Sequence, residues 1–213
     1  YPFSDAAAIK PPLGDLDLLE MVDIGGPTMV RASAKNHLNV IIACNPDDYS
    51  SIIDELKSGS VSMETRRSLA LKAYEHTATY DSAISNELAG RWNGLPEDSD
   101  DTEEQSRRLP ATMTVAAHRM MHLRYGENSH QAAALYVDPD AGEGETLVTA
   151  KVEGEKAMSY NNYSDADATL RLCRSLSTDE WPETPHACVI VKHNNPCGAA
   201  LGKTQLEAYE AAL

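Results

Sequence analysis

The stretch DIGGPTMVRASAKNHLNVIIACNP, residues 23–46, decides the fold of the first part of the chain. Proline is favoured at the first position of a helix, so the Gly-Gly-Pro sequence predicts a helix over residues 27–37. The short β-branched run at residues 39–44 indicates a buried strand. The Asn-Pro pair that follows predicts another helix over residues 45–56. This succession of helix, strand and helix predicts the α/β class.

Helices are expected on both sides of this segment. Residues 15–22 are amphipathic. Ser62 is in the N-cap position of a long helix that ends near residues 89–90. Five apolar side chains recur along this helix at helical spacing and predict its buried face, namely Leu69, Ala73, Tyr80, Ile84 and Leu88.

An acidic segment divides the chain. Residues 94–108 contain Gly94, Pro96 and six Asp or Glu residues, without apolar periodicity. This composition is typical of a solvated linker between domains. We therefore expect one domain over residues 1–93 and a second over residues 109–213.

The second domain is also predicted to be α/β. Residues 134–137 and 146–152 indicate strands, and Ser164 is expected to cap a helix. Residues 187–191 indicate a buried strand. The Thr-x-x-Glu sequence at residues 204–207 is typical of a capping box at the start of a last helix.

The composition excludes several classes of protein. The chain has 213 residues and a formal net charge of -15, from 18 Lys and Arg against 33 Asp and Glu. Such a charge repels nucleic-acid phosphates, and no basic cluster offsets it. The longest apolar runs, residues 40–44 and 187–191, are far shorter than the roughly 20 residues that cross a bilayer. We expect neither nucleic acid nor a membrane as a partner.

The cysteine pattern and the two chain termini indicate the cellular compartment and the extent of the protein. Four widely spaced cysteines without a Cys-x-x-Cys pair favour a reducing, cytoplasmic compartment. The chain begins without Met or a signal-peptide pattern and stops inside the helical pattern of residues 205–213. We therefore expect a piece of a longer protein.

The first motif with potential for chemistry is Asp23-Ile24-Gly25-Gly26-Pro27-Thr28. Two glycines before a helix N-terminus let backbone N–H groups approach an anion. Arg31 and Lys35 share one face of that helix because they are four residues apart. A nucleotide or a phosphorylated sugar would fit here. The alternative is a tight turn beside a solvated basic face.

Two further motifs are polar. The stretch LRYGENSHQ at residues 123–131 is dense in hydrogen-bonding side chains, and it is either a binding loop or a polar surface loop. At residues 189–198, VIVKHNNPCG places Lys192 and His193 at the end of an apolar strand. A neutral His there could accept a proton while Lys stabilises negative charge. The alternative is a His that caps the strand through a backbone hydrogen bond.

No zinc site is expected. His118 and His122 are spaced i, i+4, but Arg119 stands where the H-E-x-x-H pattern of helical zinc sites needs Glu. The sequence after Pro196 lacks the second Cys of the zinc deaminases, and His193 is not followed by their Glu.

Six strings occur in the order found in one family. They are YPF (1–3), DIGGPTMVRASAKNH (23–37), ETRRSLALKAYEHTATYD (64–81), LRYGENSHQ (123–131), YNNYSDADA (160–168) and VKHNNPCG (191–198). On these strings the chain resembles the central part of bifunctional purine biosynthesis proteins. These proteins join a transformylase for aminoimidazole carboxamide ribonucleotide (AICAR) to an IMP cyclohydrolase.

The resemblance implies folds and reactions. It implies a methylglyoxal-synthase-like first domain that lacks its N-terminal part, and a zinc-free, cytidine-deaminase-like second domain. The reactions are formyl transfer from 10-formyltetrahydrofolate to AICAR and cyclisation of formyl-AICAR to IMP with loss of water. The family also implies a homodimer, no metal, and folate-site residues mostly C-terminal to this stretch.

The resemblance also implies roles for individual residues. Asp23, Ile24 and Tyr1 would contact the nucleotide in the cyclohydrolase, with Lys35 as the acid-base group of ring closure. In the transformylase pattern, Arg124 and Tyr125 hold the substrate, His193 accepts a proton and Lys192 stabilises the transition state. Asn162 is a further candidate for that pocket. Ser129 stands where the family usually has Pro, which bears on the rigidity of its loop.

Two other classes are weighed against this one. A non-catalytic module for nucleotide binding or assembly is favoured if the chain binds nucleotide and turns nothing over. A Rossmann-type dehydrogenase is disfavoured because Gly25 and Gly26 are not followed by the third Gly of its fingerprint.

Overall fold

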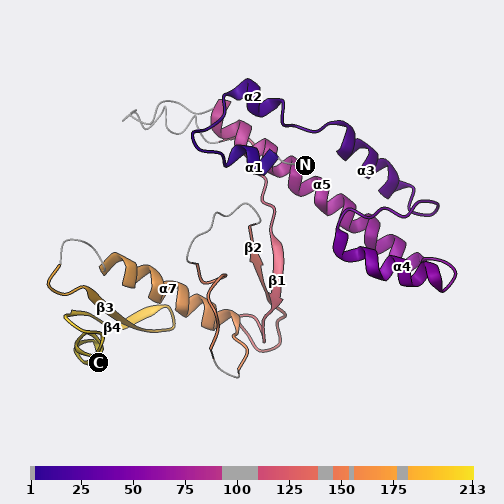
Figure 1. Cartoon of the computed structure of the whole chain (residues 1–213). Helices are drawn as coiled ribbons and strands as arrows, with labels where there is room; N and C mark the ends of the chain where they lie inside the picture. The colour runs from indigo at the N-terminus through magenta and orange to yellow at the C-terminus, as the bar shows by residue number, and fades with distance from the viewer. Residues whose placement is uncertain (1–2, 93–109, 139–145, 154–155, 177–181) are drawn as a thin grey trace. The chain divides into compact units, whose positions relative to one another are not determined.

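The computed structural model describes residues 3–92, 110–138, 146–153, 156–176 and 182–213 (Figure 1). The chain divides into two compact units, Tyr1–Ala116 and Ala117–Leu213. The acidic segment at 94–108 lies outside the described residues. The first unit extends to Ala116 because Thr114 is bonded to α5 (Met63–Trp92). Its hydroxyl accepts from Ser82 Oγ at 2.8 Å, and its carbonyl accepts from Asn86 Nδ2 at 2.9 Å.

The elements of the first unit that the structure describes are all helical. Before α5 they are α1 (Phe3–Ala7), α2 (Asp15–Leu19), α3 (Gly25–Lys35), the 3-10 helix η1 (Pro46–Asp48) and α4 (Tyr49–Lys57). Ser62 caps α5 as predicted, since its hydroxyl accepts from Thr65 N at 3.1 Å. The predicted helix over residues 45–56 is present as η1 and α4.

Helix α5 takes part in every buried apolar cluster of this unit. Tyr80 packs with Phe3, Ala6 and Leu18 of α1 and α2, Ala70 and Ala73 pack with Ala34 of α3, and Leu69 packs with Ile52 and Val61. The buried face predicted for α5 is therefore confirmed at Leu69, Ala73 and Tyr80. Fully burying a side chain such as Phe3 or Leu18 contributes about 1.5–3 kcal/mol.

The predicted strand at residues 39–44 is not formed. Residues 40–44 lack regular secondary structure, and the described part of this unit offers no strand to pair with. The alternation expected of a strand is still present. Ile42 and Cys44 pack beside the Ala34 cluster, while Ile41 and Ala43 pack beside the Ile52 cluster. Burial raises the pKa of the Cys44 thiol.

Helix α3 begins two residues earlier than predicted. Pro27 is its third residue because the Asp23 carboxylate already caps the helix, with Oδ1 accepting from Gly26 N at 2.6 Å. Asp23 is held in turn by α5, since its backbone N–H donates to the Tyr80 hydroxyl at 2.8 Å.

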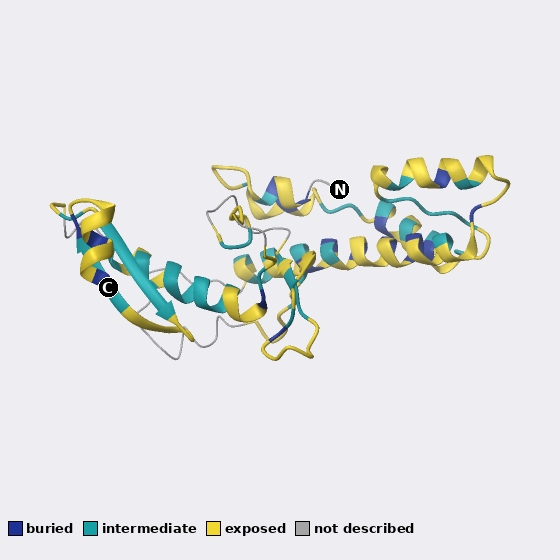
Figure 2. Cartoon of the chain, turned by 90° about the horizontal axis from the view of Figure 1, so that it is seen from below, coloured by how far each residue is buried: buried dark blue, intermediate teal, exposed yellow. Residues whose placement is uncertain are grey.

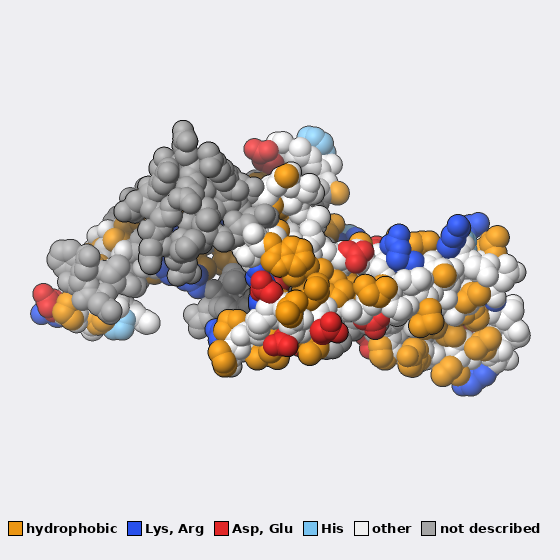
Figure 3. All heavy atoms as spheres, turned by 90° about the horizontal axis from the view of Figure 1, so that it is seen from above, with side chains coloured by type: hydrophobic (Ala, Val, Ile, Leu, Met, Phe, Trp, Pro, Cys, Tyr) orange, Lys and Arg blue, Asp and Glu red, His pale blue; other side chains and the backbone are white. Residues whose placement is uncertain are grey.

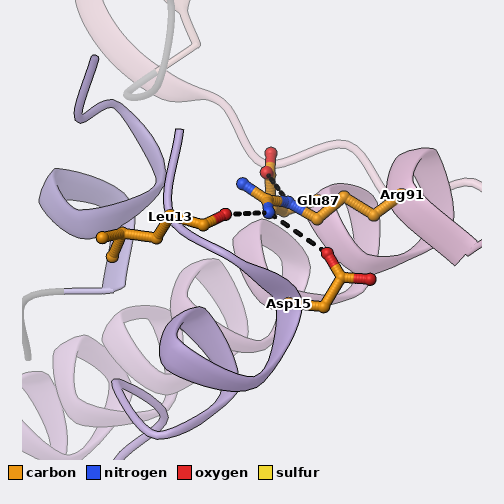
Figure 4. Close-up of polar contacts among 4 residues, drawn as sticks. All are labelled: Leu13, Asp15, Glu87 and Arg91. Carbon is orange, nitrogen blue, oxygen red and sulfur yellow. Dashed lines mark hydrogen bonds and ion pairs between the residues drawn. The ribbon is translucent and has the colours of Figure 1, made fainter. Parts of the chain in front are cut away.

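A guanidinium group ties α2 to the far end of α5 (Figure 4). Arg91 Nη1 donates to the Leu13 carbonyl at 2.8 Å and contacts Asp15 Oδ1 at 3.3 Å, while Arg91 Nε contacts Glu87 Oε1 at 2.6 Å. The hydrogen bond to Glu87 is the main reason that the pKa of Arg91 is raised. These bonds position the residues just before α2.

The start of α5 is joined to α4 by a carboxylate. Glu55 Oε2 accepts from Ser62 N at 2.6 Å, and Glu55 Oε1 accepts from the Thr65 hydroxyl. These bonds favour the charged form, so the pKa of Glu55 is lowered. A negative charge at a helix N-terminus is also favoured by the helix dipole.

We expect Glu55→Gln to lower the stability of the first unit at neutral pH and to have little effect in acid. A carboxyl whose pKa is depressed on folding contributes stability above its unfolded pKa, and this contribution is lost as the pH falls through the folded pKa. Thermal unfolding from pH 7 down to pH 3 measures the effect. The control is Glu64→Gln, because Glu64 is an exposed carboxylate in the first turn of α5, the helix end that Glu55 contacts. Equal loss at every pH would contradict the assignment.

In the second unit, the described residues form two antiparallel two-stranded sheets and two helices. The elements are β1 (His118–His122), β2 (Ala134–Val137), α7 (Tyr160–Leu176), β3 (His186–Lys192), β4 (Asn195–Gly202) and α8 (Gln205–Ala212). Strand β1 pairs with β2, and β3 pairs with β4 from His186↔Gly202 to Lys192↔Asn195. The predicted strands at 134–137 and 187–191 are confirmed. The mixture of helices and strands agrees with the predicted α/β class.

Two predictions in this unit are wrong. The expected strand at 146–152 is replaced by a turn, because Thr149 Oγ1 donates to the Thr146 carbonyl at 3.1 Å. Helix α7 begins at Tyr160, before the cap expected at Ser164. Its cap is Ser159, whose N–H and hydroxyl both donate to Asn162 Oδ1 at 3.0 Å.

The capping box at residues 204–207 is confirmed in a slightly different form. Thr204 Oγ1 accepts from Glu207 N at 3.1 Å, while Glu207 Oε2 accepts from Lys203 N at 2.9 Å. Helix α8 lies closely on β4, and Ala208 and Ala212 are among its buried residues (Figure 2).

Apolar side chains are also spread over the surface of the first unit (Figure 3). Leu16, Ile24, Met29 and Leu38 are 79%, 73%, 68% and 62% exposed. Among the described residues, no helix combines the length and apolarity that crossing a membrane requires.

Candidate functional site

The N-terminal end of α7 holds the polar loop that contains Arg124 and Tyr125. Arg124 N donates to the Met158 carbonyl at 3.1 Å, and Tyr160 N donates to the Tyr125 carbonyl at 3.0 Å. Further along, Asn161 Nδ2 donates to the Glu127 carbonyl at 3.0 Å. The loop backbone is therefore fixed to α7 while the Arg124 side chain stays exposed.

The loop is also closed on itself. Gly126 N donates to the Gln131 carbonyl at 2.9 Å, and Asn128 N donates to Gln131 Oε1 at 2.8 Å. Gly126 favours this approach, since a Cβ there would lie 3.0 Å from Gln131 Cβ and the Gln131 side chain would have to shift. These bonds restrain the loop that carries Ser129 in place of Pro.

Arg124 and Tyr125 are arranged for ligand contact. The Arg124 guanidinium lies over the Tyr125 ring, with Cζ 4.7 Å from the ring centroid, and Nη2 donates to the Tyr125 hydroxyl at 3.1 Å. Stacking of this kind orients the planar guanidinium and leaves its other N–H groups to bind a phosphate or a carboxamide.

Lys192 and His193 lie at a hairpin turn. The turn between β3 and β4 consists of His193 and Asn194, with φ values of 53° and 61°. Positive φ at both central residues is typical of a type I′ turn. Such a backbone costs of order 1–3 kcal/mol per non-glycine residue and is tolerated best by Asn, Asp and His. Because β4 runs antiparallel to β3, the site is a hairpin tip and not the edge of a parallel sheet.

The imidazole of His193 does not cap the strand. The turn is held by other groups, since Asn195 Nδ2 donates to the His193 carbonyl at 2.7 Å and Asn194 N donates to Asp165 Oδ1 at 2.8 Å. Among the described residues, no hydrogen-bond partner of the His193 ring or of the Lys192 amine is found. Both side chains are exposed, so they are available to a ligand.

The structure brings the two motifs together through α7. Asn161 and Asp165 are four residues apart, so they share one helical face about 6 Å apart along the axis. Asn161 holds the loop of Arg124 and Tyr125, while Asp165 holds the turn of His193. Neither anchor was predicted from the sequence. The i, i+4 spacing of Asn161 and Asp165 would reveal them once the start of the helix is known.

Asn162 has a structural role in this arrangement. Its Oδ1 accepts from both the backbone N–H and the hydroxyl of Ser159, which is 1% exposed. The side-chain oxygen is therefore engaged in capping α7.

The candidates in the first unit are spread along α3. Asp23 and Ile24 precede the helix, and the exposed Lys35 is its last residue, which places them about 17 Å apart along the axis. Arg31 lies between them, with Cζ 5.5 Å from the centroid of the Tyr74 ring. A nucleotide bound here would have to extend along α3 to reach both ends. Tyr1 lies outside the described residues.

The two histidines that were weighed as zinc ligands do not lie together on one helical face. His118 and His122 are the first and last residues of β1, so they are about 13 Å apart along the strand instead of one helical turn. In the part of the chain that the structure describes, no group of three or more His, Cys, Asp or Glu side chains could hold a metal ion.

Comparison with known proteins identifies the family. Residues 33–213 match the family described as AICARFT/IMPCHase bienzyme, and the chain belongs to this family. A bifunctional purine biosynthesis protein PurH from Persephonella marina (strain DSM 14350 / EX-H1) is 46% identical over 215 residues. That alignment covers 100% of this chain and 38% of the relative. The chain thus spans less than half the length of this relative.

Proposed function

We propose that this chain carries parts of two active sites of a bifunctional purine biosynthesis enzyme, one for formyl transfer to AICAR and one for closure of formyl-AICAR to IMP. The observation that supports it is the anchoring of two polar motifs on one face of α7. There the guanidinium of Arg124 would bind substrate, and the imidazole of His193 and the amine of Lys192 would act on it.

In the proposed formyl transfer, the 5-amino nitrogen of AICAR attacks the formyl carbon of 10-formyltetrahydrofolate. His193 accepts the amine proton, and Lys192 stabilises the tetrahedral oxyanion. The bond from the formyl carbon to N10 then breaks, and N10 takes the proton from His193. The products are formyl-AICAR and tetrahydrofolate.

In the proposed ring closure, the carboxamide nitrogen of formyl-AICAR attacks its formyl carbon and water leaves. This step needs proton transfer and positioning, without redox chemistry. Lys35 would move the proton, and the N-terminus of α3 beside Ile24 would face the nucleotide. Asp23 would act from the cap of that helix.

The finer structural assignments belong to the same proposal. Residues 1–93 would be the C-terminal part of a methylglyoxal-synthase-like cyclohydrolase domain, and residues 109–213 the start of a cytidine-deaminase-like transformylase domain. We further propose a cytoplasmic homodimer. The exposed apolar side chains of the first unit support a surface that is covered in the assembled enzyme.

Two measurements test this function. Calorimetry with AICAR on the 213-residue chain reports binding by the part present here. Assays of both half-reactions on the full-length enzyme that contains it report turnover. Formation of formyl-AICAR and IMP supports the proposal. Nucleotide binding without either turnover would identify a non-catalytic binding module instead.

We expect Lys35→Ala in the full-length enzyme to abolish ring closure and leave formyl transfer nearly unchanged. Lys35 and His193 belong to different compact units, and the effects of substitutions that share no partners are usually independent. The matched control is Lys57→Ala, an exposed lysine that also ends a helix of the first unit. Separate assays with AICAR and with formyl-AICAR decide the matter. Equal loss of both activities would refute the two-site assignment.

A further inference from the structure

A carboxylate from α7 reaches the backbone of the turn that presents His193. Asp165 Oδ1 accepts from Asn194 N at 2.8 Å, and Asp165 itself is half-buried. In a type I′ turn the N–H of the second central residue points away from the hairpin and is open to a partner from outside it. Asp165 supplies this partner.

The hydrogen bond from Asn194 to Asp165 lies in the turn where the backbone conformation is energetically unfavourable. His193 and Asn194 have φ values of 53° and 61°, so the turn needs support from its surroundings. A hydrogen bond to a charged carboxylate is stronger than one between neutral groups. The Asp165 bond therefore favours the turn conformation, and with it the direction in which the Cα–Cβ bond of His193 leaves the hairpin tip.

Helix α7 also holds the loop that carries Arg124 and Tyr125, so the Asp165 bond links the His193 turn to the same helix as the proposed substrate-binding loop. Asn161, one turn before Asp165, donates to the Glu127 carbonyl at 3.0 Å. The backbone of the His193 turn and the backbone of the loop that carries Arg124 are thus both bonded to α7.

We propose that Asp165 is a positioning residue for formyl transfer, which holds the turn at Asn194 and thereby aims the His193 imidazole at the substrate bound by Arg124. This inference rests on the proposed function. Asp165 acts through the turn and does not touch the reacting atoms.

The contact is tested first on the 213-residue chain, independently of activity. Amide hydrogen exchange by NMR should show that Asp165→Ala speeds exchange at Asn194 by roughly tenfold or more. Asp165→Asn keeps an acceptor oxygen and should restore most of the protection. The matched control is Asp167→Ala, because Asp167 lies on the same helix and pairs with Arg171 at 2.8 Å. Unchanged exchange in Asp165→Ala would overturn the contact.

The positioning role is tested in the full-length enzyme. Asp165→Ala should lower kcat for formyl transfer about tenfold, with the KM for AICAR little changed, and Asp165→Asn should recover most of the rate. Asn194→Gly makes a positive φ easier, so the loss caused by Asp165→Ala should be smaller in that background. Faster exchange at Asn194 with unchanged kcat, or equal losses in both backgrounds, would refute the role. An inactive wild-type enzyme would instead refute the proposed function.

Discussion

His193→Asn in the full-length enzyme is expected to lower kcat for formyl transfer by roughly 10²-fold or more, the scale of a positioned acid-base group. His193→Ala should do at least as much. Asn is the sharper variant because φ at position 193 is 53°, a conformation that Asn tolerates and Ala does not. The turn then survives while the imidazole is lost, and the KM for AICAR should change little.

Two neighbouring variants separate chemistry from binding. Lys192→Met keeps the stem and removes the charge, so it should also lower kcat, because the formyl oxygen becomes anionic only during the reaction. Arg124→Ala should raise KM, since the role proposed for Arg124 is to bind substrate groups that do not change during formyl transfer. Steady-state kinetics with AICAR as the varied substrate compares them. A His193→Asn enzyme with unchanged kcat would reduce His193 to a turn residue.

The second large effect concerns folding. Gly198→Ala is expected to destabilise the second unit by about 3 kcal/mol or more, because the new Cβ would lie 1.7 Å from the Ala212 carbonyl oxygen. This oxygen belongs to the backbone of α8, so the last turn of the helix must shift away from β4. Denaturant unfolding followed by amide exchange over residues 117–213 measures the loss.

The control for this substitution is Gly90→Ala in α5. A Cβ at Gly90 meets nothing within 4 Å, so this variant should be neutral or stabilised by about 0.5–1 kcal/mol. A Gly198→Ala chain as stable as the wild type would show that α8 is not packed closely on β4.

The sequence predicts best where a local signal acts alone. Ser62 and Thr204 were identified as caps because their partners lie three residues away. The strand at 187–191 was identified from its apolar run. At residues 39–44 the β-branched run predicts a buried strand, and this prediction is wrong, because pairing depends on a neighbouring strand that the local sequence does not reveal.

The candidate site shows the same limit. Arg124, Tyr125, Lys192 and His193 stand out in the sequence as dense polar groups. Their common support on α7 does not, because the predicted helix starts at Ser164 and leaves out Asn161, and because the partner of Asp165 is a backbone N–H of a distant turn. The positive φ values of His193 and Asn194 belong to a two-residue hairpin turn. The identities of these two residues alone do not predict such a turn.

The reliance of both motifs on α7 has a consequence for heat inactivation. The cap formed by Ser159 and Asn162 is the end of the helix to which the Arg124 loop is tied, and Asp165 lies less than two turns further on. Fraying from this end would release the substrate loop and the His193 turn almost together. If both motifs act as proposed above, substrate affinity and turnover should therefore be lost together on warming.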